Sequence, residues 1–305
     1  MVRVSDPGAE GPGATVADPK SAVATPPARA AERSTGGAAR GGVLARLGQR
    51  QARLHAVSIA WQLARLDLLR RYTSTMLGML WAILSPLCMA AIIGTVFGKL
   101  FRVELQTFLP YLFLNLTFWA FFVACLDGGA ISFIAAEGYI KQIARVPLLA
   151  YPLRMVMAAF VTLLLGLFAV VLVVLLFGGR PTPGWAWVLP GLAAWFLFGT
   201  ALATLSGIAN TWMRDLSYIQ TVGVQALFYA TPIMFPSSLL VSHGLQPLLT
   251  WNPLYHLLIL VQVPLLFGNR PPVEHYVAVA LSLALVLGLA FAGLRFVRRR
   301  LVFWL

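Results

Sequence analysis

The feature that most constrains this chain is a long uncharged stretch that follows a pair of arginines. Residues 68–101 read LLRRYTSTMLGMLWAILSPLCMAAIIGTVFGKLF, and no charged side chain occurs between Arg71 and Lys99. A run of about 20 apolar residues crosses the hydrocarbon core of a bilayer as a helix. Arginines beside such a run tend to stay in the cytoplasm. We therefore expect residues 76–98 to form the first membrane span, which starts on the cytoplasmic side.

The overall composition is that of a polytopic membrane protein. Hydrophobic residues make up 59% of the 305 residues and charged residues only 11%, a balance far from that of soluble domains. The formal net charge of +13 could suggest a nucleic-acid partner, but the charges flank the apolar runs and do not alternate with aromatic residues. Cytoplasmic lysines and arginines account for this charge, so we expect no nucleic acid.

Six apolar runs predict an all-α polytopic membrane protein with six transmembrane helices. All but four of the 23 lysines and arginines fall on one side of such a chain; the four are Lys99, Arg102, Arg180 and Arg270. This asymmetry places both termini in the cytoplasm. The expected spans are residues 76–98, 109–126, 155–177, 185–209, 218–235 and 276–294.

The segments outside the spans carry their own signals. Residues 1–45 are rich in Ala, Gly and Pro, which predicts a disordered cytoplasmic tail ahead of a membrane domain of residues 46–305. Asp127-Gly128-Gly129 is expected to end the second span. Asn252-Pro253 opens an apolar run that Pro264 interrupts, too short to cross, which predicts a re-entrant outer segment. An N-terminal interfacial amphipathic helix is expected from apolar residues at spacings of three and four: Leu54, Val57, Trp61, Ala64 and Leu68.

The polar residues do not form the groups that catalysis needs. The ten acids are scattered over the tail and loops on opposite sides, and the four histidines lack metal-ligand spacing, so no catalytic or metal site is expected. No G-x-x-x-x-G-K-[ST] motif occurs, so energy from ATP must come from another chain. No span carries an acid or base in its middle, which disfavours a lone secondary transporter or ion channel. Cys88 and Cys125 lie at different expected depths and should not pair.

A family resemblance rests on residues near the first span. The order Arg71-Tyr72, Thr75, Leu77-Gly78, Leu80-Trp81 and Pro86, before a helix that ends Val96-Phe97-Gly98, resembles the permease subunits of ABC-2 type polysaccharide exporters. These are the membrane halves of transporters for O-antigen, capsule, teichoic acid and related lipid-linked glycans. Three later features also resemble the family: Arg145-Val146-Pro147 followed by Pro152, Arg214-Asp215-Leu216 after the fourth span, and Trp251-Asn252-Pro253-Leu254.

The resemblance implies a permease that exports a lipid-linked polysaccharide across the bacterial cytoplasmic (inner) membrane. It implies a homodimer that pairs with two copies of a separate ATPase subunit. ATP and Mg would bind that subunit, and no cofactor would bind this chain. The longest inner loop and the loop after span four would contact the ATPase through Glu137, Lys141, Arg145, Pro147, Arg214 and Asp215. The lipid-linked substrate would approach at the cytoplasmic rim beside Trp61, Arg70, Arg71 and Tyr72.

Several stripes within the spans combine aromatic rings with amides and hydroxyls. Polar groups at membrane depth tend to face protein or a water-filled path, and sugars offer C–H faces to rings and hydroxyls to polar groups. Ordinary packing is the alternative for every aromatic residue. The residues expected to line a substrate path are Trp81, Ser85, Tyr111, Asn115, Phe118, Phe122, Thr221, Gln225 and Phe228.

Two other functions stay open. One is an ABC-2 permease for a small hydrophobic drug or lipid, which differs in the substrate that stimulates it. The other is an integral-membrane glycosyltransferase, which would turn over sugar without ATP.

Overall fold

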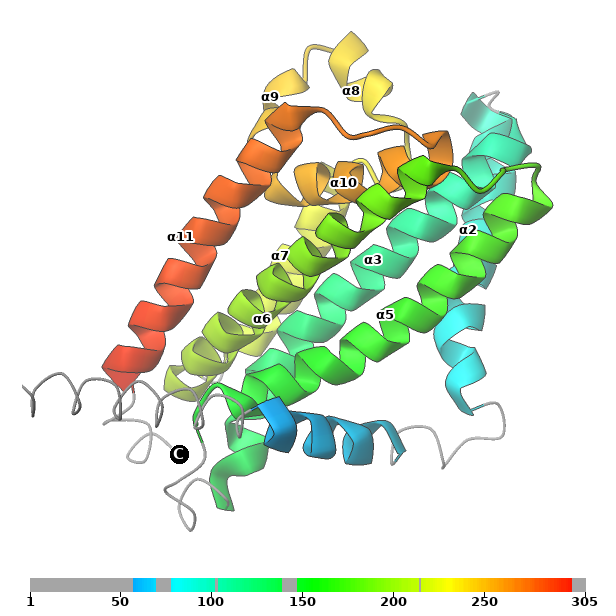
Figure 1. Cartoon of the computed structure of the whole chain (residues 1–305). Coiled ribbons are helices and arrows are strands. Elements are labelled where there is room, and N and C mark those ends of the chain that lie inside the picture. The colour runs from blue at the N-terminus through cyan, green and yellow to red at the C-terminus, as the bar shows by residue number, and fades with distance from the viewer. Residues whose placement is uncertain (1–56, 70–77, 102–103, 139–146, 214, 298–305) are drawn as a thin grey trace, which may run out of the picture. The chain divides into compact units, whose positions relative to one another are not determined.

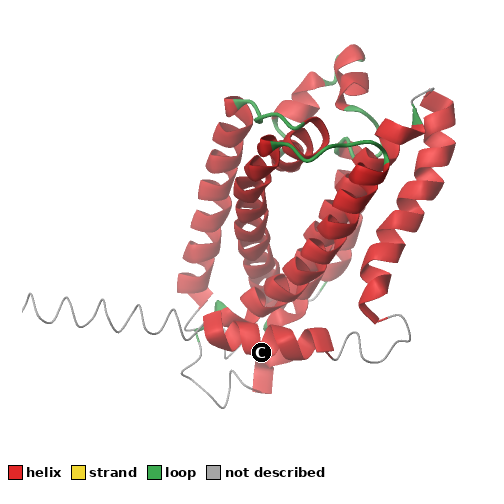
Figure 2. Cartoon of the chain, turned by 45° about the vertical axis from the view of Figure 1, so that its right-hand side comes forward, coloured by secondary structure: helices red, strands yellow, loops and turns green. Residues whose placement is uncertain are grey.

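The computed structural model describes residues 57–69, 78–101, 104–138, 147–213 and 215–297. The chain divides into two units, Met1–Gln49 and Arg50–Leu305, and all described residues belong to the second. They form helices joined by short loops, and the described ranges contain no strand (Figure 2). The predicted all-α class is thus confirmed for these residues. The expected tail of residues 1–45 lies outside them.

Five helices among the described residues are long and apolar enough to cross a membrane. Each overlaps one expected span, and the boundaries differ by a few residues at either end. They are α2 (Trp81–Phe101), α3 (Leu105–Ser132), α5 (Ala150–Leu176), α6 (Val188–Trp212) and α11 (Val273–Val297). Short 3-10 helices precede two of them: η1 (Gly78–Leu80) before α2 and η3 (Pro183–Trp187) before α6.

The sixth expected span, residues 218–235, corresponds to the shorter helix α7 (Leu216–Ala230) of 15 residues. A helix of this length rises about 22 Å, less than the ~30 Å hydrocarbon core of a bilayer. It ends where it does because Pro232 disfavours helical geometry at Thr231, whose backbone is extended. The six-span count therefore stays a prediction.

Helix α3 packs against α2, α5, α6, α7 and α10 (Figure 1). Its aromatic residues form much of the core. The ring of Phe118 lies 5.2 Å from that of Trp195 on α6, and the ring of Phe121 lies 5.9 Å from that of Phe160 on α5. Helices α2 and α11 bury few of their residues, so their apolar faces are open to lipid or to another subunit.

The expectation that Asp127-Gly128-Gly129 ends a helix is wrong, because α3 continues to Ser132. Gly129 serves close packing instead: a Cβ added there would lie 2.4 Å from the Cα of Ala203 on α6. Helix α6 also donates to the α3 backbone nearby, from Asn210 Nδ2 to the Ala130 carbonyl at 2.9 Å. Small residues and such hydrogen bonds hold membrane helices together. A glycine pair permits a helix to end but does not require it.

The segment between α7 and α11 contains three short helices at one end of the bundle (Figure 1): α8 (Ser237–Ser242), α9 (Gln246–Thr250) and α10 (Pro253–Phe267). As expected, Asn252 begins α10, and its side chain accepts a hydrogen bond from Leu254 N at 3.0 Å. Pro264 does not interrupt the helix, which ends at Gly268 in left-handed geometry with φ 68°. At 15 residues α10 is still too short to cross, and its re-entrant placement stays a prediction.

The helix over residues 57–69 lies at the opposite end of the bundle (Figure 1). Of the expected apolar face, Ala64 and Leu68 are buried, together with Ala60, while Val57 and Trp61 are about half exposed. Ala60 packs in one cluster with Ala150 and Leu153 at the start of α5. The sequence pattern left out Ala60 because alanine adds little to a hydrophobic periodicity, although it allows close helix packing.

Candidate functional site

A buried polar cluster joins α3 to the segment that follows α7. The Tyr111 hydroxyl donates to the Pro232 carbonyl at 2.7 Å and has the Phe235 carbonyl at 3.1 Å as a second acceptor. One turn along α3, Asn115 Nδ2 donates to the Ile233 carbonyl at 3.2 Å. These α3 side chains thus satisfy backbone carbonyls that lie outside any helix, and they hold residues 231–235 in place.

Helix α10 completes the same cluster. Gln262 Nε2 donates to Asn115 Oδ1, and Asn252 Nδ2 donates to Thr231 Oγ1 at 2.9 Å. On the α6 side, Trp195 Nε1 donates to the Leu257 carbonyl at 3.1 Å. Asn115, the amide on α3 that the sequence suggested for a path, therefore finds its partners inside the subunit. Sequence alone could say only that such amides avoid lipid, not which protein groups they meet.

The expected aromatic path residues of α3 are also packed inside the subunit. Phe118 has no exposed surface and Phe122 is 5% exposed. Phe122 and Phe228 both contact Trp119, with ring centroids 5.1 and 5.2 Å away. Phe228 keeps partial exposure beside α3. In the subunit, Phe118 is a core residue, and a lining role for these rings stays a prediction about the assembled transporter.

Four expected path residues lie on the subunit surface. Trp81 and Ser85 are exposed on α2, and Thr221 and Gln225 are exposed on α7. Helix α7 has no buried residue at all. Its open face includes Tyr218 and Tyr229 as well as Gln225, a face more polar than lipid tails favour.

A second polar cluster, which the sequence interpretation missed, joins α3, α6 and α7. Gln220 Nε2 donates to Asp127 Oδ1 at 3.3 Å, and Ser206 Oγ donates to Gln220 Oε1 at 2.6 Å. Ser206 Oγ also lies 3.0 Å from the Leu126 carbonyl. We call Asp127, Ser206 and Gln220 the inner polar cluster. The sequence could have indicated this cluster if Asp127 had been recognised as an acid inside a helix. The expectation that a helix ends at Asp127 hid that possibility.

The residues expected to contact an ATPase are only partly described. Glu137 follows the short helix η2 (Ile134–Ala136), Pro147 precedes α5, and Asp215 is the exposed residue before α7. Lys141, Arg145 and Arg214 lie outside the described residues. The C-terminal ends of α3 and α11 and the N-terminal end of α5 meet in a small cluster of Phe133, Tyr151 and Val297.

At the expected substrate approach, Trp61 is half exposed, whereas Arg70, Arg71 and Tyr72 lie outside the described residues. Arg154 Nε at the start of α5 lies 3.8 Å from Asp67 Oδ2. The ion pair ties helix 57–69 to the first turn of α5, a few residues after Pro147.

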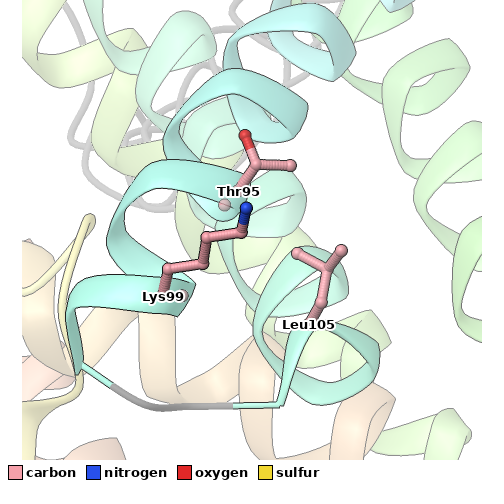
Figure 3. A pocket seen from close by; sticks show the side chains of 5 residues that line it. Thr95, Lys99 and Leu105 are labelled. Carbon is pink, nitrogen blue, oxygen red and sulfur yellow. The ribbon is translucent and has the colours of Figure 1, made fainter.

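At the opposite end of α2, a shallow cavity of about 260 Å³ lies against α3 (Figure 3). Gly94 and Gly98, which the sequence suggests as a small-residue packing patch, form its floor, and Leu105 closes one side. The Thr95 hydroxyl donates to its own helix at Ile92 O, 2.9 Å away, and Lys99 is exposed. A Cβ on Gly94 would meet Leu105 at an ordinary 3.5 Å, so the spacing of α2 and α3 does not require glycine there.

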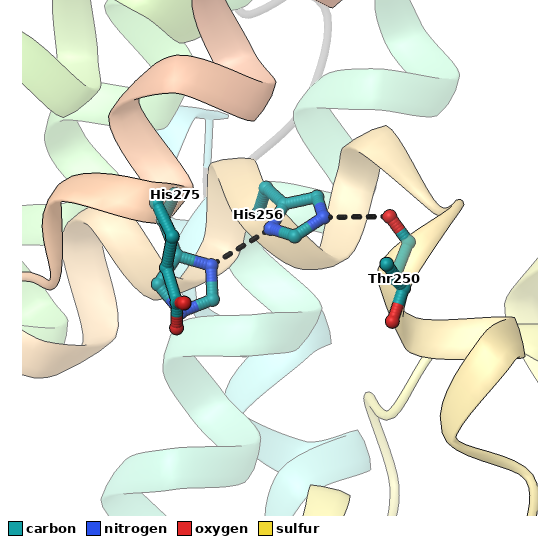
Figure 4. A network of polar contacts seen from close by, with 4 residues as sticks. Thr250, His256 and His275 are labelled. Atoms are coloured by element: carbon teal, nitrogen blue, oxygen red, sulfur yellow. Dashed lines mark hydrogen bonds and ion pairs between the residues drawn. The ribbon is translucent and has the colours of Figure 1, made fainter.

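Two buried histidines connect α10 to α11 (Figure 4). His256 Nδ1 lies 2.7 Å from His275 Nδ1, and His256 Nε2 lies 3.0 Å from the Thr250 carbonyl. Because Nε2 must donate to that carbonyl, neutral His256 accepts at Nδ1 and His275 donates. The described residues contain no group of three or more His, Cys, Asp or Glu side chains that could hold a metal ion.

Comparisons with known proteins agree with this architecture. The ABC-2 type transporter family matches residues 60–266. An O-antigen export system permease protein RfbA from Klebsiella pneumoniae is 30% identical over 191 residues, 62% of this chain and 72% of the relative. A protein of the same name from Myxococcus xanthus is 25% identical over 221 residues, 72% of this chain and 84% of the relative. With apolar helices that can cross a membrane and a match over most of its length, the chain belongs to the ABC-2 type transporter family.

Proposed function

We propose that this chain is the membrane permease of an ABC exporter that moves a lipid-linked polysaccharide out of the cytoplasm. Two copies would form a homodimer and pair with two copies of a separate ATPase subunit, which would bind ATP and Mg. The observation that carries the proposal is the similarity to permeases of O-antigen export. The exposed face of α7, with its tyrosines, Thr221 and Gln225, adds support because it suits a hydroxyl-rich chain better than lipid.

Depletion of the permease in its source organism tests this function. Surface polysaccharide should fall while the lipid-linked glycan accumulates in the cytoplasmic membrane. Depletion of the partner ATPase should give the same two changes, because neither subunit works alone. Unchanged surface glycan with a new sensitivity to hydrophobic drugs would favour a drug or lipid permease. Sugar turnover by the purified chain without ATP would favour a glycosyltransferase.

We propose a six-span topology in the inner membrane, with both termini cytoplasmic and residues 236–272 re-entrant from outside. In a background without Cys88 and Cys125, Trp251→Cys should react with an impermeant thiol reagent added to intact cells, since Trp251 is 86% exposed. Asp215→Cys should react only in inside-out vesicles. Reaction of both positions from the same side would contradict the topology.

We also propose that the loop around Glu137, Lys141 and Arg145 couples ATP hydrolysis to export. Reversal of two charges, Glu137→Lys with Arg145→Glu, should leave insertion intact and lower export per ATP hydrolysed about tenfold, since two like-charge contacts would replace attractive ones. Export and ATPase rates of the complex provide the measurement. Arg180→Glu, a reversal in the α5–α6 loop on the opposite side, is the control. Normal export by the double variant would remove this loop from the coupling contact.

A further inference from the structure

The inner polar cluster includes an exposed carboxylate near one end of α3. Asp127 lies five residues before the end of α3, about 7.5 Å from that end along the helix axis. Its side chain is exposed in the subunit, and Gln220 is its only hydrogen-bond partner among the described residues. Because α3 is about 42 Å long and the hydrocarbon core about 30 Å thick, Asp127 lies near the edge of that core. The surface between α3 and α7 thus has a polar, charged end that suits an aqueous path better than lipid.

The hydrogen bonds of the cluster leave a matched donor and acceptor available. An ionised carboxylate only accepts hydrogen bonds, so Gln220 turns Nε2 toward Asp127 and Oε1 toward Ser206 Oγ, which lies 2.6 Å away. Gln220 Nε2 uses one of its two hydrogens on Asp127 Oδ1, which leaves the second hydrogen for another acceptor. Asp127 Oδ2 is a further acceptor. A hydroxyl group both donates and accepts, so neighbouring hydroxyls of a sugar ring suit this pair.

An aromatic surface lies further along the same two helices. Trp119 is eight residues, or about 12 Å, before Asp127 on α3, and its ring meets Phe228 of α7 at 5.2 Å. Trp119 and Phe228 both keep partial exposure. The surface between α3 and α7 thus offers hydroxyl partners at the inner end and rings above it, the order in which a sugar chain leaving the cytoplasm would meet them.

We propose that Asp127 and Gln220, oriented by Ser206, bind sugar hydroxyls of the exported glycan at the inner end of its path, and that they favour an uncharged chain. This proposal rests on the proposed export function. An ionised Asp127 would repel uronate groups that pass. Ser206 contacts no substrate in this account and acts as a positioning residue.

The first test asks whether the site is wet and negative, independently of export. In the complex with its ATPase and without Cys88 and Cys125, Ala124→Cys places a thiol one turn from Asp127. At low salt, a cationic methanethiosulfonate should react about tenfold faster than an anionic one, because a unit charge about 6 Å away attracts one and repels the other. Asp127→Asn should bring the ratio near one. No reaction at this thiol, or an unchanged ratio, would overturn the proposal.

The second test uses two probes of equal length, maltohexaose and hexagalacturonate. Maltohexaose should slow modification of the thiol, and hexagalacturonate should not. Asp127→Asn should weaken protection by maltohexaose about fivefold, because an amide oxygen accepts a weaker hydrogen bond than a carboxylate, and should admit hexagalacturonate. If Asp127 only orients Gln220, maltohexaose will protect the thiol equally well in the asparagine variant and in the parent protein. That result would show that the proposal is wrong.

Export in cells separates this inference from the function it rests on. At equal permease level, Asp127→Asn should lower surface glycan about fivefold, because a neutral amide oxygen accepts a weaker hydrogen bond than a carboxylate. Glu104→Gln, which removes an exposed acid at the other end of α3, should export normally. Normal export by Asp127→Asn would reject the binding site while the export function stands. Surface glycan that does not depend on the parent permease would reject the export function itself.

Discussion

Replacement of Gly129 by valine should prevent α3 and α6 from packing at their inner halves. A Cβ at this position would lie 2.4 Å from the Cα and 2.5 Å from the carbonyl oxygen of Ala203. Both are backbone atoms, so no side-chain rotation can relieve the clash. We expect a loss of at least about 3 kcal/mol, at the upper end of the range for overpacked cores.

The loss should extend beyond the clash itself. If α6 moves away, Asn210 and Ser206 no longer reach the α3 carbonyls of Ala130 and Leu126. Thermal unfolding followed by size-exclusion chromatography of a fluorescent fusion measures the effect. Gly288→Val on α11 is the matched control, since a Cβ there would meet nothing within 4 Å. A Gly129→Val protein as stable as the control would mean that the two helices do not approach as described.

Phe118→Ala should destabilise the subunit, whereas Trp81→Ala should not. Phe118 has no exposed surface and packs against Trp195, and truncation of a buried phenylalanine costs about 3–5 kcal/mol. Trp81 is 52% exposed on α2, so its truncation removes little packing. The same unfolding assay in detergent compares the two.

Export separates the two rings in a different way. If Trp81 lines the path, Trp81→Ala should reduce export per ATP while the fold and the ATPase contact remain. Phe118→Ala should reduce export only in proportion to the loss of folded protein. A Phe118→Ala variant with full stability but poor export would restore this ring to the path and overturn its assignment to the core.

Hydrogen bonds to α3 fix the segment that follows α7. Tyr111, Asn115 and Gln262 hold residues 231–235 and α10 against α3 through side-chain and backbone hydrogen bonds. A buried amide that loses its partner costs about 1–3 kcal/mol. Any opening of a path beneath α10 must therefore replace these bonds, with water or with substrate hydroxyls.

The sequence by itself determined the membrane class, the positions of five long helices, the start of α10 at Asn252 and the ABC-2 family. These follow from hydrophobic run length, charge asymmetry and local motifs, which can be read without knowing the tertiary contacts. The tertiary structure alone decided which face of each element is buried. It buried Ala60 rather than Trp61, continued α3 through Gly129, and paired Asn115 with Gln262. The physical reason is that an amide, a glycine or an aromatic ring at membrane depth is compatible with several partners. Only the packing of neighbouring helices determines whether it meets a backbone, a second side chain or the open surface between α3 and α7.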